Sequence, residues 1–214
     1  DAIREIDPTI SVKDITAYVF DQFKETIQED FAKREGLLFV GGFAHPPNAD
    51  AVLWFARDIY PLIRRKMEEA GAAAPDFYVV GSQVTDEIRA LEQPGNGIII
   101  KGFVSEEELE RLYAECRIVV VPLRYGAGVK GKVVEAIYNG APIVTTSIGA
   151  EGIPQVEDVL VVEDEPEQFA QAVADLYQNE AACRELCERT QRYIREHFSM
   201  DAAWRVIEED FCRR

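Results

Sequence analysis

The sequence predicts an α/β protein built on a doubly wound, mostly parallel sheet. Short apolar runs alternate along the chain with stretches of helical periodicity, which is the pattern of repeated βαβ units. The apolar runs are uninterrupted, as expected for strands that helices cover on both faces. Capping and turn residues separate the elements. The expected strands occupy residues 37–41, 77–81, 98–100, 118–121, 143–145 and 159–162.

Helical periodicity fills the intervals between these strands. Asn48 is placed to cap the first helix, and Ser105 with Glu108 matches a capping box at the start of the third. Gly140 followed by Pro142 ends the helix that precedes the fifth strand. The expected helices occupy residues 48–70, 84–91, 105–115, 130–139 and 166–177.

The two ends of the chain depart from this alternation. Residues 180–197 and 200–214 have the periodicity of two extra C-terminal helices with no strand after them. Near the other end an apolar stripe predicts an amphipathic helix over 14–33, after a linker-like first dozen residues. The stripe consists of Val19, Phe20, Phe23, Ile27 and Phe31. We therefore divide the chain into 1–35, a linker plus amphipathic helix, and 36–214, the sheet domain. Whether the stripe packs internally or against another surface stays open.

Length and charge limit the classes of function. A chain of 214 residues is one large domain or two small ones, and 47% hydrophobic residues can bury a sizeable core. The formal net charge of −16 opposes general binding to nucleic acid or to an anionic membrane surface. No window has the roughly 18 consecutive apolar residues that a membrane span needs. We expect a cytoplasmic protein with no nucleic-acid partner.

The cysteines and histidines form no recognisable metal or disulfide pattern. No CxxC pair occurs, and Cys183 and Cys187 share a helical face in a chain that has only two histidines. We expect buried, reduced thiols and no bound metal. The four cysteines are Cys116, Cys183, Cys187 and Cys212.

Four loops are expected at the edge of the sheet where ligands bind. In an open parallel sheet this is the edge at the carboxyl ends of the strands, near the point where strand order reverses. The loops occupy residues 41–48, 81–85, 102–105 and 122–132.

The fourth loop carries the clearest chemical signal. Three glycines let its backbone approach a ligand, and the following helix directs free N–H groups and its positive dipole end into the same space. Lys130 and Lys132 add two charges there, and a diphosphate fits this combination. Glu135 lies one helical turn further on, where its carboxylate could accept hydrogen bonds from the two vicinal hydroxyls of a ribose. The alternatives are a glycine-rich turn with solvated lysines and a Glu that stabilises the helix dipole.

Two other phosphate motifs fit this stretch poorly. Residues 126–132 match the start of a P-loop, but Val133 stands where the Mg²⁺-binding Ser or Thr is required. No GxGxxG follows the first expected strand, so the dinucleotide-binding fingerprint is also missing.

The string Lys130-x-Lys132-x-x-Glu135-Ala136-x-x-x-Gly140-x-Pro142 resembles the donor-binding motif of a known enzyme family. The family is that of GT-B glycosyltransferases of the retaining family 4 type, also described as glycosyl transferases group 1. The resemblance runs from about Leu37 to the last helix, and the strings at 39–43, 100–104 and 118–122 support it.

The resemblance implies two Rossmann-like halves, of which this chain is the C-terminal, donor-binding one. The start at Asp1 without an initiator methionine agrees with a piece of a longer protein whose N-terminal half is missing here. The implied donor is a nucleoside-diphosphate sugar, with no cofactor and no metal. Lys130 and Lys132 would stabilise the leaving diphosphate, Glu135 would hold the ribose, and residues 102–104 would flank the base. The candidate donor-binding residues are Gly41, Gly42, His45, Gly102, Phe103, Val104, Arg124, Tyr125, Gly126, Ala127, Gly128, Lys130, Lys132 and Glu135.

Departures from the family pattern keep other functions open. Ala127 stands where many relatives have a Glu that touches the donor sugar, and Gly42 stands where many have an Arg. We expect a retaining hexosyltransferase that acts on a glycan or lipid-linked acceptor, with this fragment alone inactive and no side chain firmly catalytic. The alternatives are a non-catalytic GT-B-like binding module, half of a sugar-nucleotide epimerase and a P-loop-like NTPase.

Overall fold

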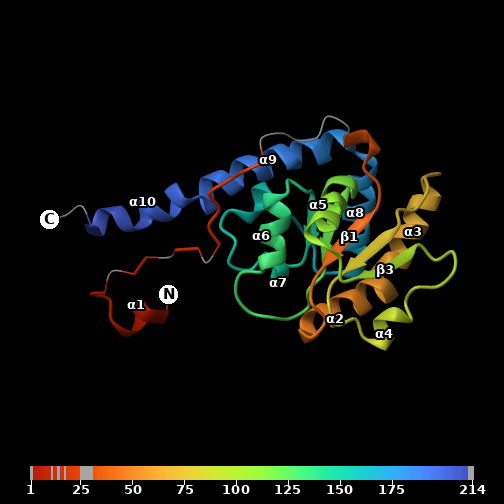
Figure 1. Ribbon diagram of the computed structural model, residues 1–214, viewed down its shortest axis with the longest axis horizontal. Helices are drawn as coiled ribbons and strands as arrows, with labels where there is room; N and C mark the ends of the chain where they lie inside the picture. The colour runs from red at the N-terminus through yellow and green to blue at the C-terminus, as the bar shows by residue number, and fades with distance from the viewer. Residues whose placement is uncertain (1, 11, 14, 17, 25–30, 212–214) are drawn as a thin grey trace.

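The computed structural model describes residues 2–10, 12–13, 15–16, 18–24 and 31–211. At its centre lies a six-stranded parallel sheet, and the predicted fold class is confirmed (Figure 1). The strand order is β3-β2-β1-β4-β5-β6, so the order reverses between β1 and β4. The strands are β1 Leu37–Val40, β2 Phe77–Val80, β3 Ile98–Gly102, β4 Ile118–Val121, β5 Ile143–Thr145 and β6 Val161–Val162.

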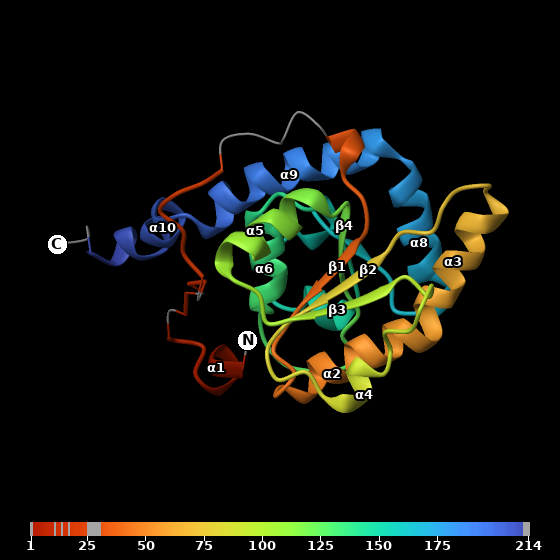
Figure 2. The same ribbon diagram turned by 45° about the vertical axis from the view of Figure 1, so that its right-hand side comes forward.

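Helices cover both faces of this sheet. In Figure 2, α5 and α6 lie on one side of the strands and α3 and α8 on the other, while α9 packs along α6. The long helices are α2 Pro46–Trp54, α3 Tyr60–Glu69, α5 Glu106–Glu115, α6 Gly131–Tyr138, α8 Pro166–Gln178, α9 Glu180–Phe198 and α10 Met200–Phe211. The short ones are α1 Ala2–Ile6, α4 Asp86–Arg89 and α7 Ser147–Ala150, with 3-10 turns η1 Phe31–Lys33 and η3 Val156–Asp158.

The single helix predicted over 48–70 is divided. Its first part, α2, is joined to α3 by a π-helical turn, η2 Phe55–Ile59. Pro61 lies in the first turn of α3, and a proline there removes one backbone donor and clashes with the preceding turn. The wider π-helical turn just before Pro61 accommodates this break while the helix continues.

The first helix also begins earlier than predicted, which corrects the role of Asn48. The cap position belongs to His45, and Pro46 and Pro47 form the first turn, where a missing N–H costs nothing. Asn48 is therefore inside the helix and only 6% exposed. The capping prediction at Ser105 is confirmed, because its hydroxyl accepts a hydrogen bond from the Glu108 N–H at 3.2 Å.

The amphipathic helix predicted over 14–33 is wrong for the described residues. Residues 18–24 run as an extended segment, in which Phe20 pairs with Ser199 in a parallel bridge and stacks on Tyr138 of α6 at 4.4 Å. Phe23 lies against Arg195 of α9, and Phe31 is fully buried. The aromatic residues thus pack on different elements, which one straight helix face could not reach. Ile27 of the stripe lies outside the described residues.

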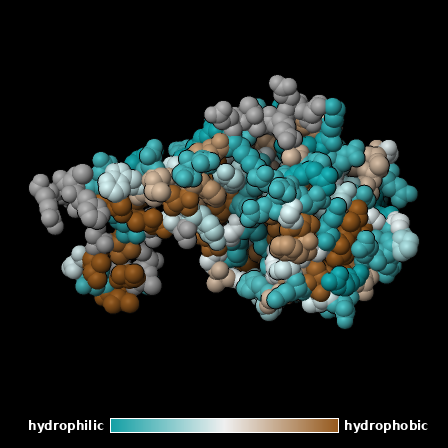
Figure 3. Space-filling model, in the orientation of Figure 1, coloured by the Kyte–Doolittle hydropathy of each residue, from teal (hydrophilic) through white to brown (hydrophobic). Residues whose placement is uncertain are grey.

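The terminal segments carry most of the large exposed apolar side chains of the described residues. Figure 3 shows hydrophobic surface over α1 and the projecting α10. These side chains are Ile3, Ile6, Ile10, Ile15, Val19, Met200 and Trp204. Within the described part of the chain, no helix combines the length and the apolarity needed to cross a bilayer. The exposed apolar surface thus lies mainly on α1, the N-terminal segment and α10, outside the sheet domain's core.

Three thiols lie in the core, as predicted. Cys116, Cys183 and Cys187 are free and buried, and burial raises the pKa of Cys116 to about 12 and that of Cys183 to about 11. Such thiols are unreactive at neutral pH. Cys212 lies outside the described residues.

Candidate functional site

The first and fourth predicted loops meet where the strand order reverses. Between them lies a hollow of about 200 Å³, at the carboxyl ends of β1 and β4. The first loop contributes His45, Pro47 and Asn48. The fourth contributes Leu123, Tyr125, Gly126, Ala127, Val129, Lys130, Gly131 and Lys132. This is the position at which open parallel sheets bind their ligands.

Lys132 is held in the floor of this hollow. Its Nζ lies 4.4 Å from the centroid of the Phe39 ring and donates a hydrogen bond to Oδ1 of Asn48. The amide nitrogen of Asn48 donates in turn to the carbonyl oxygen of Gly42 at 2.7 Å, which fixes the direction of the amide. Among the described residues, the ammonium group therefore has one polar partner and one aromatic face.

Gly41 makes room for this arrangement. A Cβ added at Gly41 would lie 2.6 Å from Nζ of Lys132 and 2.9 Å from Nδ2 of Asn48. Both polar atoms would have to shift to admit a Cβ, so glycine at position 41 leaves the space that the Lys132–Asn48 hydrogen bond occupies.

Burial lowers the pKa of Lys132 to about 7. The physical cause is desolvation of the ammonium group, because a charge in a partly dry site is less stable than its neutral form. Below that pH the side chain offers a positive charge with few competing partners. An anion that enters the hollow would replace the lost solvation.

Lys130 lies at the N-cap of α6 and is already engaged. Its Nζ pairs with Oε2 of Glu151 at 2.9 Å and donates to the carbonyl oxygen of Gly128. Lys130 makes no side-chain hydrogen bond to the first turn of α6, so it leaves the N–H groups of that turn to other partners. No motif in the sequence singles out Glu151.

Glu135 lies one turn into α6 but faces a second groove. This groove, of about 480 Å³, runs between α5 and α6, and the extended N-terminal segment forms part of its wall. Gly131 lines both the groove and the Lys132 hollow, so the two are adjacent. Burial raises the pKa of Glu135. The other groove residues are Tyr18, Phe20, Glu106, Leu109, Glu110, Tyr113, Tyr138 and Asn139.

Arg124 and the third loop lie apart from these two spaces. Arg124 donates two hydrogen bonds to the Asp50 carboxylate of α2, from Nε to Oδ2 at 2.9 Å and from Nη2 to Oδ1, and its guanidinium group lies over the Trp54 ring. The side chain of Phe103 is 82% exposed, and Gly102, Phe103 and Val104 line neither the hollow nor the groove. Their expected contact with a base stays a prediction.

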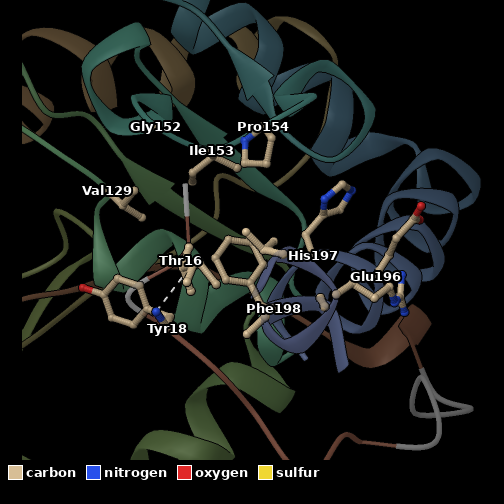
Figure 4. Close-up of a pocket in the computed structure, with 14 residues that line it drawn as sticks. Thr16, Tyr18, Val129, Gly152, Ile153, Pro154, Glu196, His197 and Phe198 are labelled. Atoms are coloured by element: carbon tan, nitrogen blue, oxygen red, sulfur yellow. Dashed lines mark hydrogen bonds between the residues drawn. The ribbon is translucent and has the colours of Figure 1, made fainter. Parts of the chain in front are cut away.

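A larger cavity of about 990 Å³ lies beside the groove (Figure 4). The N-terminal segment, the end of α9 and the loop at Gly152, Ile153 and Pro154 surround it. Tyr18 lines both this cavity and the groove, so the N-terminal segment separates them. In Figure 4 the Tyr18 N–H bonds the Thr16 hydroxyl, at 3.2 Å.

The model of one protein family, described as "Glycosyl transferases group 1", matches residues 34–179. That range includes all six strands, both loops of the hollow and Glu135. The chain belongs to this family. The resemblance inferred from the Lys130–Pro142 string is confirmed.

A curated relative of this chain is longer than the chain itself. An uncharacterized 44.6 kDa protein in a cps region of Klebsiella pneumoniae is 27% identical over 170 residues, which are 76% of this chain and 42% of that protein. The chain thus spans less than half of that curated relative.

Solved structures share the fold at low identity. A TarM variant from S. aureus, in complex with fondaparinux, alpha-GlcNAc-glycerol and UDP, is 17% identical, with a TM-score of 0.71. The match covers 99% of this chain and 42% of the TarM chain. HepE from Anabaena, in complex with UDP and glucose, is 14% identical, with a TM-score of 0.61. That match covers 87% of this chain and 50% of the HepE chain. The chain therefore has the Rossmann-like fold that makes up about half of these longer GT-B proteins.

Proposed function

We propose that this chain is the nucleotide-sugar-binding half of a retaining, metal-independent glycosyltransferase. The observation that carries the proposal is the succession along α6 of Lys130 and Lys132 at the helix start and Glu135 one turn later, at two adjacent spaces of the carboxyl edge. A diphosphate fits the first space, and a ribose with two vicinal hydroxyls fits the second. Two structural neighbours are complexes with UDP, which supports this donor class.

The positive charges that line the hollow would assist cleavage of the bond between the donor sugar and its diphosphate. When the bond between the sugar's anomeric carbon and the terminal phosphate oxygen breaks, its electron pair remains on that oxygen. The ammonium of Lys132, the ammonium of Lys130 and the N-terminus of α6 would stabilise the developing charge. Glu151 would then lose part of its pairing with Lys130 to the phosphate.

The acceptor would be a glycan or a lipid-linked glycan, bound mainly by the half of the enzyme that this chain does not contain. The exposed apolar residues of α1, the N-terminal segment and α10 would pack against that half. The cps-region relative supports polysaccharide biosynthesis as the setting, and a cytoplasmic location fits a nucleotide-sugar donor. We expect the chain alone to bind donor weakly and to transfer no sugar.

Calorimetric titration with UDP, GDP, ADP and their sugars tests the proposal. We expect at least one nucleoside diphosphate to bind the 214-residue chain at submillimolar to millimolar concentration. If none of them binds at millimolar concentration, the chain is not a nucleotide-sugar-binding half. The same titration selects the base.

Binding of inorganic pyrophosphate is expected to weaken as the pH rises above about 7, because the pKa of Lys132 in the free protein is about 7. Below that pH the ammonium is charged and binds the anion; above it each pH unit costs up to about tenfold in affinity, since binding must then take up a proton. Below about pH 6 the phosphate itself loses charge, which sets the optimum between about 6 and 7.

Titrations of pyrophosphate across this pH range check the prediction. A Lys132→Arg variant, charged throughout, should give a flatter profile. His45 and Lys130 line the same hollow, and Glu151 pairs with Lys130, so the series is repeated in His45→Gln and Glu151→Gln. The same affinity at pH of about 6.5 and about 8.5 in the wild type would contradict the assignment to Lys132.

A non-catalytic binding module is the second candidate, and Ala127 favours it. Ala127 lines the Lys132 hollow and offers no carboxylate to a donor sugar. A complete enzyme that binds nucleotide without transferring or hydrolysing the sugar would support this function. The P-loop alternative gains nothing from the structure, because the side chain of Val133 is fully buried in the core.

A further inference from the structure

Tyr113 carries a hydroxyl group that the free protein leaves without a partner. Tyr113 lies on α5 and is only 2% exposed. Among the described residues, four buried side-chain polar atoms have no hydrogen-bond partner, and the Tyr113 hydroxyl is one of them. A buried hydroxyl without a partner costs folding free energy, so its retention calls for a reason other than stability.

The aromatic residue faces the groove in which Glu135 lies. Tyr113 and Glu135 both line this groove of about 480 Å³, from α5 and α6 respectively. Burial raises the pKa of Tyr113 well above its usual range, and the Glu135 carboxylate raises it further. Glu135 is thus the charged group that acts on the phenol, and it is also open to the groove.

The hydroxyl can act on a ligand only through a neighbour. Because its oxygen is sealed from solvent, a molecule in the groove does not touch it directly. Glu135 lines the same groove as Tyr113 and acts electrostatically on its phenol, and a carboxylate has lone pairs for about four hydrogen bonds. It can accept one from a phenol and still accept two from a pair of vicinal hydroxyls.

We propose that Tyr113 is a positioning residue of the donor site, whose hydroxyl donates to the Glu135 carboxylate when a ribose occupies the groove between α5 and α6. The inference rests on the proposed function, because it assigns Glu135 to the ribose. The hydrogen bond turns the carboxylate toward the ribose hydroxyls and favours its ionised, accepting form. The cost of the unpaired hydroxyl in the free protein is recovered on binding.

The Tyr113→Phe variant removes the hydroxyl and nothing else. We expect its stability in urea to equal or exceed that of the wild type, because no hydrogen bond is lost on folding. The dissociation constant of the tightest binder among UDP, GDP and ADP should rise about tenfold. Inorganic pyrophosphate, which has no ribose, should bind both proteins equally.

Two further variants separate positioning from structure. Tyr60→Phe is the matched control, since the Tyr60 hydroxyl donates to the carbonyl oxygens of Pro75 at 2.8 Å and Gly97 at 3.1 Å. It should lose stability and keep nucleotide affinity. In a Glu135→Gln background, Tyr113→Phe should weaken nucleotide binding by less than about twofold, because the two residues act as a unit.

Each outcome decides the inference. It is wrong if Tyr113→Phe binds the nucleoside diphosphate as tightly as the wild type, or loses affinity for pyrophosphate as well, or loses stability as Tyr60→Phe does. Additive effects of Tyr113→Phe and Glu135→Gln also overturn it. If the wild type binds pyrophosphate but no nucleotide, or binds neither, the proposed function fails first and this inference fails with it.

Discussion

Replacing Lys132 by Met is expected to weaken the binding of inorganic pyrophosphate and of nucleoside diphosphates by about 100-fold. Met keeps an unbranched stem against the Phe39 ring but removes the ammonium group, which lies 4.4 Å from that ring and bonds Asn48. In a partly dry site, a charge-assisted contact to phosphate contributes about 1.5–3 kcal/mol. Calorimetry at a pH of about 6.5, where Lys132 is mostly charged, measures the loss.

The same variant should be more stable than the wild type. The pKa of Lys132 is lowered from 10.5 to about 7 on folding, so the unfolded chain binds the proton more tightly. The resulting loss of folding free energy is complete below about pH 7. It decreases as the pH rises toward 10.5, the pKa of the lysine side chain in the unfolded chain. The stability gained by Lys132→Met should accordingly be largest at low pH and disappear near pH of about 10.

Lys66→Met provides the control for charge removal elsewhere. Lys66 of α3 pairs with Glu167 of α8 at 2.7 Å, outside the hollow and the groove. Its replacement should leave the affinity for pyrophosphate unchanged. If the wild type and Lys132→Met bind pyrophosphate with equal affinity, Lys132 is not part of the binding site, whatever the change in stability.

Replacing Gly81 by Ala is expected to destabilise the fold by about 3 kcal/mol and to abolish pyrophosphate binding together with it. A Cβ at Gly81 would overlap the carbonyl oxygen of Gly41 and lie 2.7 Å from its carbonyl carbon. Backbone on both sides has no room to move, because the Gly41 N–H bonds Val80 at 2.9 Å and the Gly81 N–H bonds Gly102 at 2.8 Å. A clash here displaces Gly41, on which the Lys132–Asn48 hydrogen bond depends.

Thermal unfolding checks this prediction, with a drop of roughly 6–12 °C expected for a chain of this size. Gly71→Ala is the matched control. Gly71 has φ of +70°, but nothing lies within 4 Å of an added Cβ. It should cost only about 1 kcal/mol of left-handed strain and leave binding intact. Equal destabilisation by both substitutions would show that backbone conformation, not the contact with Gly41, limits position 81.

Much of the fold was predictable because its signals are local. A short apolar run predicts a buried strand wherever it lies, and all six expected strands match the structure to within two residues at each end. The sixth, expected at 159–162, is shorter because the η3 turn occupies the residues just before it. The order of the strands depends on which runs pair, and pairing is a property of the folded sheet.

The N-terminal stripe shows where local periodicity misleads. Val19, Phe20 and Phe23 have helical spacing, yet the chain there is extended and bridges Ser199. Tyr138 of α6 and Arg195 of α9 supply tertiary contacts for Phe20 and Phe23, and such contacts outweigh the weak tendency of a short segment to form a helix of its own. Such a partner, about 180 positions away, leaves no trace in the neighbouring sequence.

By itself, the sequence determined the parallel α/β fold, the family, and the spacing of Lys130, Lys132 and Glu135 on which the proposed donor site rests, because the signal for each lies in residues close together. Only the tertiary structure decided the burial and the hydrogen-bond partners of those side chains. Asn48, expected as a cap, instead holds a lysine 84 positions away. Tyr113 was not singled out at all, and its significance comes from a missing hydrogen bond beside Glu135. Burial and hydrogen bonding depend on distant segments brought together, so the chemistry of the site became readable only when the chain was folded.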